Sequence, residues 1–267
     1  MAASVPHDLE FYRAQVEAAL DRELPSPETR PAVLHAAIRH AIGAGGKRLR
    51  PVICLAVAEA TGGRWEDALF PALAIEVLHN YTLVHDDLPA MDNDRERRGQ
   101  PSVWAKFGEA NAILAGDAML AFAYRLAARA PRRVAEIVDV LGEMGVGVVC
   151  GQVEDVALAA GGVSAPADDY VYRHKTADLF IAAAKMGALA VGADAAQVAA
   201  AGAFALQLGL AFQYEDDLLD GDGIRDRETT RRLVDETTSA ALAALDDFAG
   251  DTSFLAALAR RLVNRTV

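Results

Sequence analysis

The sequence predicts an all-α protein, a helical bundle built around a deep apolar cavity. Apolar residues recur at helical spacing, turn signals come only about every fifteen to twenty-five residues, and no segment alternates as a strand would. Two long apolar segments also end in clusters of carboxylates, one at Asp86 and one at Asp216. Two buried helices of this kind would present their carboxylates at one mouth of the cavity.

Composition predicts a single domain over residues 1–267. A chain of 267 residues with 52% hydrophobic content can bury one large core, and no linker or internal repeat divides it. The net charge of −12 argues against a nucleic-acid partner, because such partners need a basic face. Cys54 and Cys150 have no metal-ligand spacing, and the N-terminus has no basic region followed by an apolar run. We therefore expect a cytoplasmic protein without a signal peptide.

Breaks in the sequence define the first three helices. A helix over residues 7–24 is stopped by Pro25, and a second, opened by a Ser-Pro pair, covers residues 26–43. The glycine-rich break at residues 44–46 precedes a third helix, expected to start near Arg50.

The fourth predicted helix, Glu66 to Asp87, carries the first acidic cluster. Pro89 ends it, because the residue before a proline avoids α geometry. Asp92 must then reach any bound ion from a turn. His79 precedes Asp86 by two helical turns and lies on the same face; a core histidine with no ligand is the alternative.

The remaining helices complete the bundle. We expect them at Asn111–Arg129, Arg132–Ala160, Asp168–Val191, Ala193–Phe212 with an extension to Asp220, Thr229–Phe248 and Ser253–Asn264. The glycines within Arg132–Ala160 weaken that helix but allow close packing. Ala193–Phe212 is apolar enough to raise the question of a membrane span. Asp194, Gln197 and Gln207 interrupt it, so we expect no membrane insertion and a fully buried helix of a soluble protein.

The carboxylate clusters are candidate metal ligands. Carboxylates packed this densely are costly unless something binds them, and Mg²⁺ takes one or two of them together with phosphate oxygens and water. Asp216 and Asp220 are one helical turn apart, and Gln213 lies on the same face. The candidate ligands are Asp86, Asp87, Asp92, Asp216, Asp217 and Asp220.

Basic residues provide candidate anion sites. A helix starting near Arg50 would direct free backbone N–H groups toward an anion, with Lys47 and Arg48 nearby. A solvated basic turn is the alternative at this position. Arg97 and Arg98, just downstream of the first acidic cluster, suit a phosphate rather than a metal.

In order and spacing these motifs resemble those of the trans-isoprenyl diphosphate synthases, the polyprenyl synthetase family, and most closely its bacterial farnesyl diphosphate synthase type. The match runs from about Arg39 to Asp220. It comprises Gly45-Gly-Lys-Arg-Leu-Arg-Pro51, the first aspartate motif with a Pro-Ala insertion, Arg97-Arg-Gly99, Phe107-Gly-Glu-Ala-Asn-Ala-Ile-Leu-Ala-Gly-Asp117, Lys175-Thr176, and the second aspartate motif.

The resemblance implies an isoprenoid synthase fold and a prenyltransferase reaction, and we expect a homodimer. That reaction is the head-to-tail (1'-4) condensation of isopentenyl diphosphate with an allylic diphosphate, giving farnesyl diphosphate. It also implies about three Mg²⁺ ions, two held by Asp86 and Asp92 and a third by Asp216 with Asp217 and Asp220.

Substrate contacts follow from the same resemblance. Arg97 and Lys175 would hold the allylic diphosphate, Thr176 would lie by the developing cation, and Gln213 counts among the catalytic and substrate-binding residues. The residues implied for isopentenyl diphosphate are Lys47, Arg50, His79 and Arg98.

The chain also departs from the family. Ala177 replaces the usual glycine, and the lysine-bearing loop after Asp220 is missing. There are three alternatives: arginines supply the lost positive charge, the site closes in a different way, or activity is altered. The sequence leaves all three open. The arginines in question are Arg225, Arg227, Arg231 and Arg232.

Other functions are compatible with parts of this sequence. A class I terpene cyclase would use the same carboxylates but a single diphosphate, so the second set of basic residues argues against it. A non-catalytic partner subunit fits the missing loop but not two intact aspartate motifs. A structural helical protein without activity is the remaining alternative, and a geranylgeranyl or other short-chain synthase differs only in product.

Product length depends on the residues just before Asp86. Thr82, at i−4, shares its helical face by ideal geometry, whereas Tyr81 is turned by about 140°. The resemblance nevertheless implies that the aromatic residue at i−5, with the Pro-Ala insertion, limits the product to farnesyl diphosphate.

Overall fold

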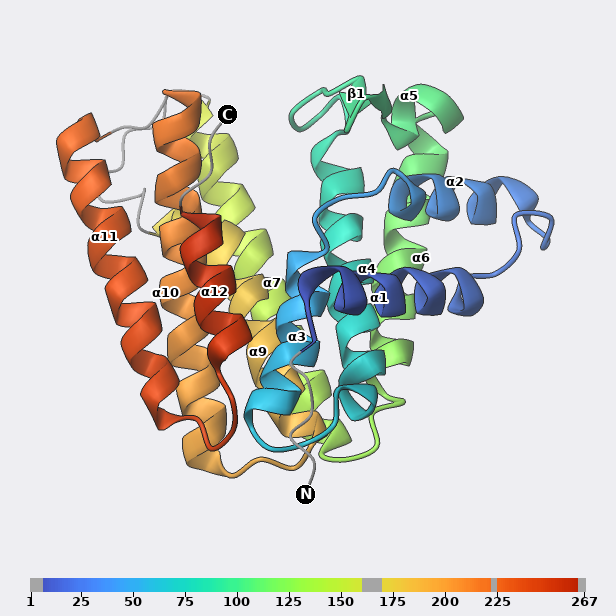
Figure 1. The fold of residues 1–267 in the computed structure, drawn as a ribbon. Helices are drawn as coiled ribbons and strands as arrows, with labels where there is room; N and C mark the ends of the chain where they lie inside the picture. The colour runs from blue at the N-terminus through green and yellow to red at the C-terminus, as the bar shows by residue number, and fades with distance from the viewer. Residues whose placement is uncertain (1–6, 160–169, 222–224, 264–267) are drawn as a thin grey trace.

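The computed structural model describes residues 7–159, 170–221 and 225–263. The protein is a helical bundle (Figure 1). The N-terminal part contains α1 (Leu9–Glu23), α2 (Ala32–Gly43), α3 (Leu49–Ala60), α4 (Leu69–Asp86), α5 (Val103–Phe107) and α6 (Glu109–Ala127). The C-terminal part contains α7 (Val134–Ala159), α9 (Asp178–Ala190), α10 (Ala195–Asp220), α11 (Arg227–Ala244) and α12 (Ser253–Leu262).

The core lies where α3, α4 and α9 meet. These three helices are buried on almost every side, and their apolar residues read as near-continuous runs for that reason. Small residues allow the close approach: a Cβ at Gly187 of α9 would lie 2.2 Å from the carbonyl oxygen of Cys54 on α3. Figure 1 shows α10, α11 and α12 on one side of this centre and α6 on the other.

The carboxyl ends of α4 and α10 point to the same end of the bundle, the upper end in Figure 1. Local chemistry fixes these helices. The side chain of Asp194 caps the start of α10 by accepting a hydrogen bond from the N–H of Gln197 (2.9 Å). α4 ends at Asp86, three residues before Pro89, and Asp92 lies in the turn that follows, as the sequence predicts.

Several predicted boundaries are wrong. The second helix starts at Ala32 rather than Ser26, because residues 26–31 form turns that end at the N-cap residue Pro31. The predicted fourth helix begins as a separate 3-10 turn, Trp65–Ala68. The predicted fifth starts at Glu109, after Gly108, whose φ of +86° separates it from α5. The predicted ends at Ala160, Asp168 and Asn264 lie outside the described residues.

Besides the five-residue helix α5, two further elements were not predicted from the sequence. A two-residue hairpin, β1 (Glu96–Arg97) with β2 (Gln100–Pro101), follows the first acidic cluster, although no strand was expected. A π-helical turn, Tyr172–Ala177, precedes α9 where regular helix was expected. The first is too short to show a strand period, and the second depends on tertiary packing.

The apolar helix α10 is only partly buried. By length and composition it is the one helix of the described ranges that could cross a membrane, and 44% of its most apolar stretch is buried. It packs against α9 and α11 through small residues and Phe204. The expectation of a fully buried helix is therefore wrong, because only one broad face meets its neighbours.

Candidate active site

The first acidic cluster lies at the end of α4. Asp86 is half-buried in the last turn, and the backbone N–H of Asp92 donates to the Asp86 carbonyl oxygen (2.9 Å), which closes the following turn. Burial, with the negative charge of Asp92, raises the pKa of Asp86 to about 6, against the opposing effect of Lys175. A cation bound near Asp86 would lower this raised pKa by stabilising the carboxylate.

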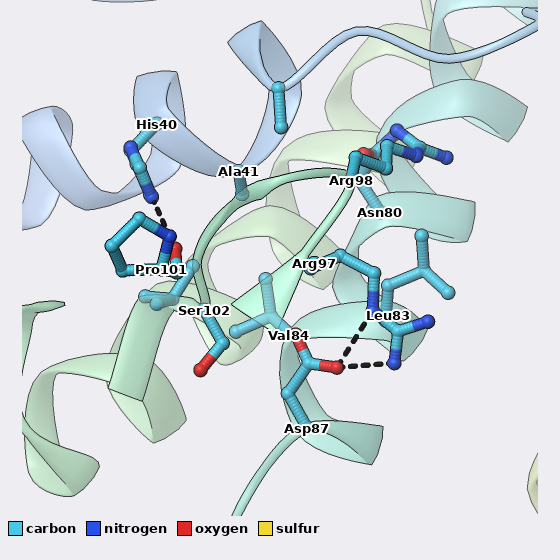
Figure 2. A pocket seen from close by; sticks show the side chains of 12 residues that line it. His40, Ala41, Asn80, Leu83, Val84, Asp87, Arg97, Arg98, Pro101 and Ser102 are labelled. Carbon is cyan, nitrogen blue, oxygen red and sulfur yellow. Dashed lines mark hydrogen bonds and ion pairs between the residues drawn. The ribbon is translucent and has the colours of Figure 1, made fainter. Parts of the chain in front are cut away.

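Asp87 is held by a cation of the protein itself. Its buried carboxylate accepts hydrogen bonds from Arg97 Nε (2.8 Å) and Nη2, as Figure 2 shows. Arg97 also donates to Asp94 (3.0 Å). Burial raises the pKa of Asp87, and the hydrogen bonds from Arg97 oppose that shift. The predicted metal role of Asp87 stays a prediction, and its observed contact is the one that orients Arg97.

Figure 2 also shows how the hairpin anchors this region. His40 Nε2 lies 2.8 Å from the carbonyl oxygen of Pro101 in β2, while Arg97 and Arg98 extend from the hairpin in different directions. The cavity between them has about 20 Å³ and is lined in part by Asn80 and Ser102. That is room for about one water molecule and no substrate.

The second acidic cluster is connected to the π-helical turn by a chain of hydrogen bonds. The Thr176 hydroxyl donates to Gln213 Oε1 (2.9 Å), and Gln213 Nε2 donates to Asp217 Oδ1 (3.2 Å). The Tyr172 hydroxyl donates to the other oxygen of Asp217 (2.7 Å). Asp217 is therefore oriented by α10 and by the turn at once, with Asp216 next to it in the same helix.

Lys175 is paired with a residue that the sequence analysis missed. Its Nζ donates to Asp155 Oδ2 on α7 (2.6 Å), and both side chains are about one-third exposed. The two elements approach closely because Gly151 has no side chain: a Cβ there would lie 2.5 Å from the Lys175 backbone nitrogen. Gln152 and Asp155 lie at i and i+3 and, with Glu154, interrupt an apolar segment; this was the signal that could have identified this face.

The predicted second anion site forms a pocket of about 480 Å³. Its lining includes the four predicted residues Lys47, Arg50, His79 and Arg98, together with Glu76 and Phe212. The sequence thus brings the start of α3, the middle of α4 and the hairpin to one place. The alternative of a solvated basic turn is wrong for Arg50, which is half-buried beneath this pocket.

Charge in this pocket favours an anion. Arg50 Nη1 donates to His79 Nε2 (3.2 Å), and burial with the charges of Arg50 and Arg98 holds the pKa of His79 well below its usual range. Burial lowers the pKa of Arg50 to about 10, so it remains charged at neutral pH. The guanidinium lies 5.0 Å from the ring centroid of Phe180, a cation–π contact. His79 is therefore neutral and keeps its other ring N–H as a donor.

Arg48 has a structural role instead. Its guanidinium is buried and donates to Glu76 (2.6 Å), Glu17 (2.7 Å) and the carbonyl oxygen of Ile42 (2.6 Å). Its backbone is left-handed, with φ of +50°, at the N-cap of α3. The network fixes the start of α3 and thereby the position of Arg50 two residues later.

An apolar cavity of about 330 Å³ extends from Asp86 between α4 and α7. Both Tyr81 and Thr82 line it, so the two candidates for the length limit face the same space. The α7 side of the lining consists of Val148, Val149, Gln152, Val153 and Val156. An acidic mouth leading into an apolar cavity of this size suits a ligand with a charged head and a hydrocarbon tail.

The four arginines after the second acidic cluster divide into two pairs. Arg225 lies over the rings of Tyr172 and Tyr214 (5.7 and 5.6 Å), and with Arg227 it lines a cleft of about 260 Å³ next to Asp217. The other two lie near acidic side chains, Arg231 near Glu215 (3.8 Å) and Arg232 near Glu236 (3.7 Å). Residues 222–224 of this segment lie outside the described residues.

No three His, Cys, Asp or Glu side chains of residues 7–159, 170–221 and 225–263 are close enough together to form a metal site by themselves. The first acidic cluster, with Asp86 in the cavity wall, and the second cluster at the end of α10 instead each offer a few oxygens. This arrangement fits Mg²⁺, which needs only one or two protein carboxylates when phosphate oxygens and water complete its shell.

Comparisons with known proteins agree with this site. The family model named polyprenyl synthetase matches residues 31–235. A farnesyl diphosphate synthase of Geobacillus stearothermophilus is 40% identical over 234 residues, which cover 84% of this chain and 78% of that protein. The chloroplastic heterodimeric geranylgeranyl pyrophosphate synthase large subunit 1 of Arabidopsis thaliana is 40% identical over 77% of this chain, which spans only 58% of that relative.

The fold agrees as well. The crystal structure of an FPP/GFPP synthase from Zymomonas mobilis superposes with a TM-score of 0.89 at 32% identity, covering 96% of this chain and 97% of the other. The matched family model spans most of the chain, and a relative of similar length is 40% identical. The chain therefore belongs to the polyprenyl synthetase family.

Proposed function

We propose that the protein is a trans-prenyl diphosphate synthase. It joins isopentenyl diphosphate head to tail (1'-4) to dimethylallyl or geranyl diphosphate, and farnesyl diphosphate is its main product. The observation that supports this most directly is the pairing of two sites: a basic pocket at Lys47, Arg50 and His79 beside an acidic mouth that opens into an apolar cavity. One diphosphate fits each site.

The acidic mouth suits about three Mg²⁺ ions. Asp86, whose pKa is raised by burial, and Asp92 would hold two, while Asp216 with Asp217 and Asp220 would hold the third. When bound, Mg²⁺ supplies Lewis-acid neutralisation of the departing diphosphate. Asp87 is the least suited of the predicted ligands, since Arg97 already occupies one of its oxygens.

Other side chains of the protein bind the two diphosphate substrates. Arg97 and Lys175 bind the allylic diphosphate, while Lys47, Arg50 and Arg98 bind isopentenyl diphosphate, to which neutral His79 donates its free ring N–H. The allylic C–O bond breaks, with its electron pair leaving on the diphosphate. The double bond of isopentenyl diphosphate then forms the new C–C bond, and the released diphosphate takes the proton.

The apolar lining protects the allylic cation. Val148, Val153 and Val156 offer no nucleophile, and their surface excludes water that would otherwise capture the cation. Thr176 and Gln213, joined by a hydrogen bond, would present their oxygens to the reacting carbon. These oxygens would stabilise positive charge at the reacting carbon.

Farnesyl diphosphate is the proposed product because the ring of Tyr81 lies in the cavity wall. The named relatives include both a farnesyl and a geranylgeranyl synthase, so length depends on this chain's own cavity. A larger product would need the space that the ring now fills.

We also propose a homodimer. Large apolar side chains are exposed along α6 and α7, namely Ile113 (45%), Leu114 (57%), Val146 (65%) and Val153 (64%). Exposed apolar side chains on two neighbouring helices favour a partner, and a second copy would cover them and close the outer side of the cavity. Light scattering coupled to size-exclusion chromatography tests this by giving twice the chain mass.

One incubation tests the proposed reaction. The purified protein is mixed with Mg²⁺, labelled isopentenyl diphosphate and dimethylallyl diphosphate, and the products are extracted and separated by chain length. Labelled farnesyl diphosphate, absent when EDTA is added, supports the proposal. A hydrocarbon formed from an allylic diphosphate alone identifies a terpene cyclase, and no product at all identifies a non-catalytic subunit.

A further inference from the structure

The ring of His85 occupies a space that only a glycine leaves free. His85 lies in the last turn of α4, and its Nε2 is 3.1 Å from the carbonyl oxygen of Ile113 on α6. A Cβ at Gly116, one turn further along α6, would lie 2.1 Å from the same Nε2 and 2.4 Å from the neighbouring ring carbon. The imidazole is thus packed directly against the backbone of α6.

The same ring supports Tyr81. The two residues are i and i+4 on α4, with ring centroids 5.1 Å apart and an interplanar angle of 77°. This edge-to-face contact is a favourable arrangement for aromatic rings. Both residues also line the apolar cavity, so the position of His85 determines how far the ring of Tyr81 projects into it.

We propose that Gly116 is a specificity-determining position for product length. By leaving room for His85 against α6, Gly116 keeps the imidazole out of the cavity, and His85 in turn holds the ring of Tyr81 at the cavity wall. Gly116 and His85 are positioning residues here, since neither needs to touch the diphosphates. This proposal rests on the proposed prenyl synthase function.

Substituting the two residues should change product length in opposite directions. In Gly116→Ala the new methyl group displaces the imidazole, and the free volume open to it is the cavity shared with Tyr81. The cavity shortens, and we expect the ratio of geranyl to farnesyl diphosphate to rise about tenfold or more. In His85→Ala the tyrosine loses its support, and the ratio of geranylgeranyl to farnesyl diphosphate should rise instead.

The double variant separates this steric relationship from a general disturbance of α6. In Gly116→Ala/His85→Ala no imidazole remains to be displaced, so its product distribution should match that of His85→Ala alone. Gly145→Ala is the matched control. It makes the same change within α7, where the added Cβ would meet only Leu78 at an ordinary 3.5 Å, and its products should match those of the wild type.

Unfolding measurements test the packing without any substrate. Gly116→Ala should lower the melting temperature of the wild type, because the methyl group and the imidazole overlap. In the His85→Ala background the same change should raise it, because alanine favours helix over glycine. If Gly116→Ala does not fold while the double variant does, the packing is supported equally.

Three results would overturn the proposal. An unchanged product distribution in Gly116→Ala, with the wild type making farnesyl diphosphate, rejects the inference and leaves the proposed function intact. A double variant that is as unstable as Gly116→Ala shows that the methyl group clashes with something other than His85. A wild-type protein that forms no prenyl diphosphate rejects the proposed function and, with it, this inference.

Discussion

Lys175 and Asp155 form an ion pair between the π-helical turn and α7, with Nζ donating to Oδ2 over 2.6 Å. The lysine is also close enough to Asp86 to oppose the rise in the pKa of that carboxyl. We propose that the Lys175 ammonium binds the allylic diphosphate. Before substrate binds, this ammonium is paired with the Asp155 carboxylate, which the substrate must displace.

The first prediction concerns this displacement. Asp155→Asn keeps an oxygen that orients Lys175 but removes the competing charge. Because a partly exposed ion pair contributes only about 0.2–1 kcal/mol, we expect the KM for the allylic diphosphate to fall by no more than about fivefold. Lys175→Gln should raise the same KM. Initial rates at fixed isopentenyl diphosphate measure both, and a rise in KM for Asp155→Asn would mean that the carboxylate itself assists binding.

The second prediction is that turnover depends on both acidic clusters. Asp86→Ala and Asp216→Ala should each lose several orders of magnitude in turnover, because each removes a proposed Mg²⁺ ligand rather than core packing. Asp139→Ala, an exposed position on α7, is the matched control and should remain active. Circular dichroism checks that all three fold, and near-normal turnover of either site variant at ordinary Mg²⁺ would rule out the proposed ion arrangement.

The third prediction follows from the pKa of Asp86, about 6 against an ordinary 3.8. The folded protein holds this proton more tightly than the unfolded chain does. The contribution of Asp86 to stability is therefore fully present below about pH 4 and is lost as pH rises through about 6. Without Mg²⁺, Asp86→Asn should match the wild type at about pH 4 and exceed it at pH 8 by up to about 3 kcal/mol.

Urea denaturation of both proteins in EDTA measures this difference. Comparing the two at each pH cancels the titration of the groups that do not interact with Asp86. A difference that does not grow between pH 4 and pH 8 would show that the carboxyl of Asp86 titrates normally.

The sequence was most informative where the cause is local. Pro89 ends the fourth helix whatever packs around it, so Asp92 could be placed in a turn. The π-helical turn could not be predicted, because it depends on Gly151 of α7 meeting the backbone of Lys175. The start of α2 was misplaced because Ser26 precedes several turn residues and does not cap the helix directly.

For the site as well, local features could be predicted and distant partners could not. The acidic clusters and the basic segment were visible because each is contiguous in the chain. Their partners were not, since Asp155 is twenty positions from Lys175. Nor could the sequence show that Arg48 is paired with Glu76 while Arg50 contacts His79, because both arginines lie in the same short segment of sequence.

The fourth prediction concerns the lysine-bearing loop that the chain lacks. Arg225 and Arg227 line the cleft next to Asp217, so we expect this pair to supply the missing positive charge. Arg225→Gln/Arg227→Gln should raise the KM for the allylic diphosphate about tenfold or more, since hydrogen bonds to charged groups contribute about 1.5–3 kcal/mol.

The matched control for this pair is Arg231→Gln/Arg232→Gln, whose side chains lie near Glu215 and Glu236 instead. It removes the same charge from the same segment of the chain, and its KM for the allylic diphosphate should change little. Equal effects of the two double variants would show that only the overall charge of the segment matters.

The last prediction is that Tyr81 limits product length. Ideal helical geometry favours Thr82 for the face of Asp86, yet both side chains line the cavity, and the tyrosine ring is by far the larger obstacle. Tyr81→Ala should therefore shift the main product from farnesyl toward geranylgeranyl diphosphate with little loss of total turnover. Thr82→Ala removes only a hydroxyl and a methyl group at the same cavity and should shift the distribution less. Chromatography of the products decides between them, and an unchanged distribution in Tyr81→Ala would place the end of the cavity elsewhere along α4 or α7.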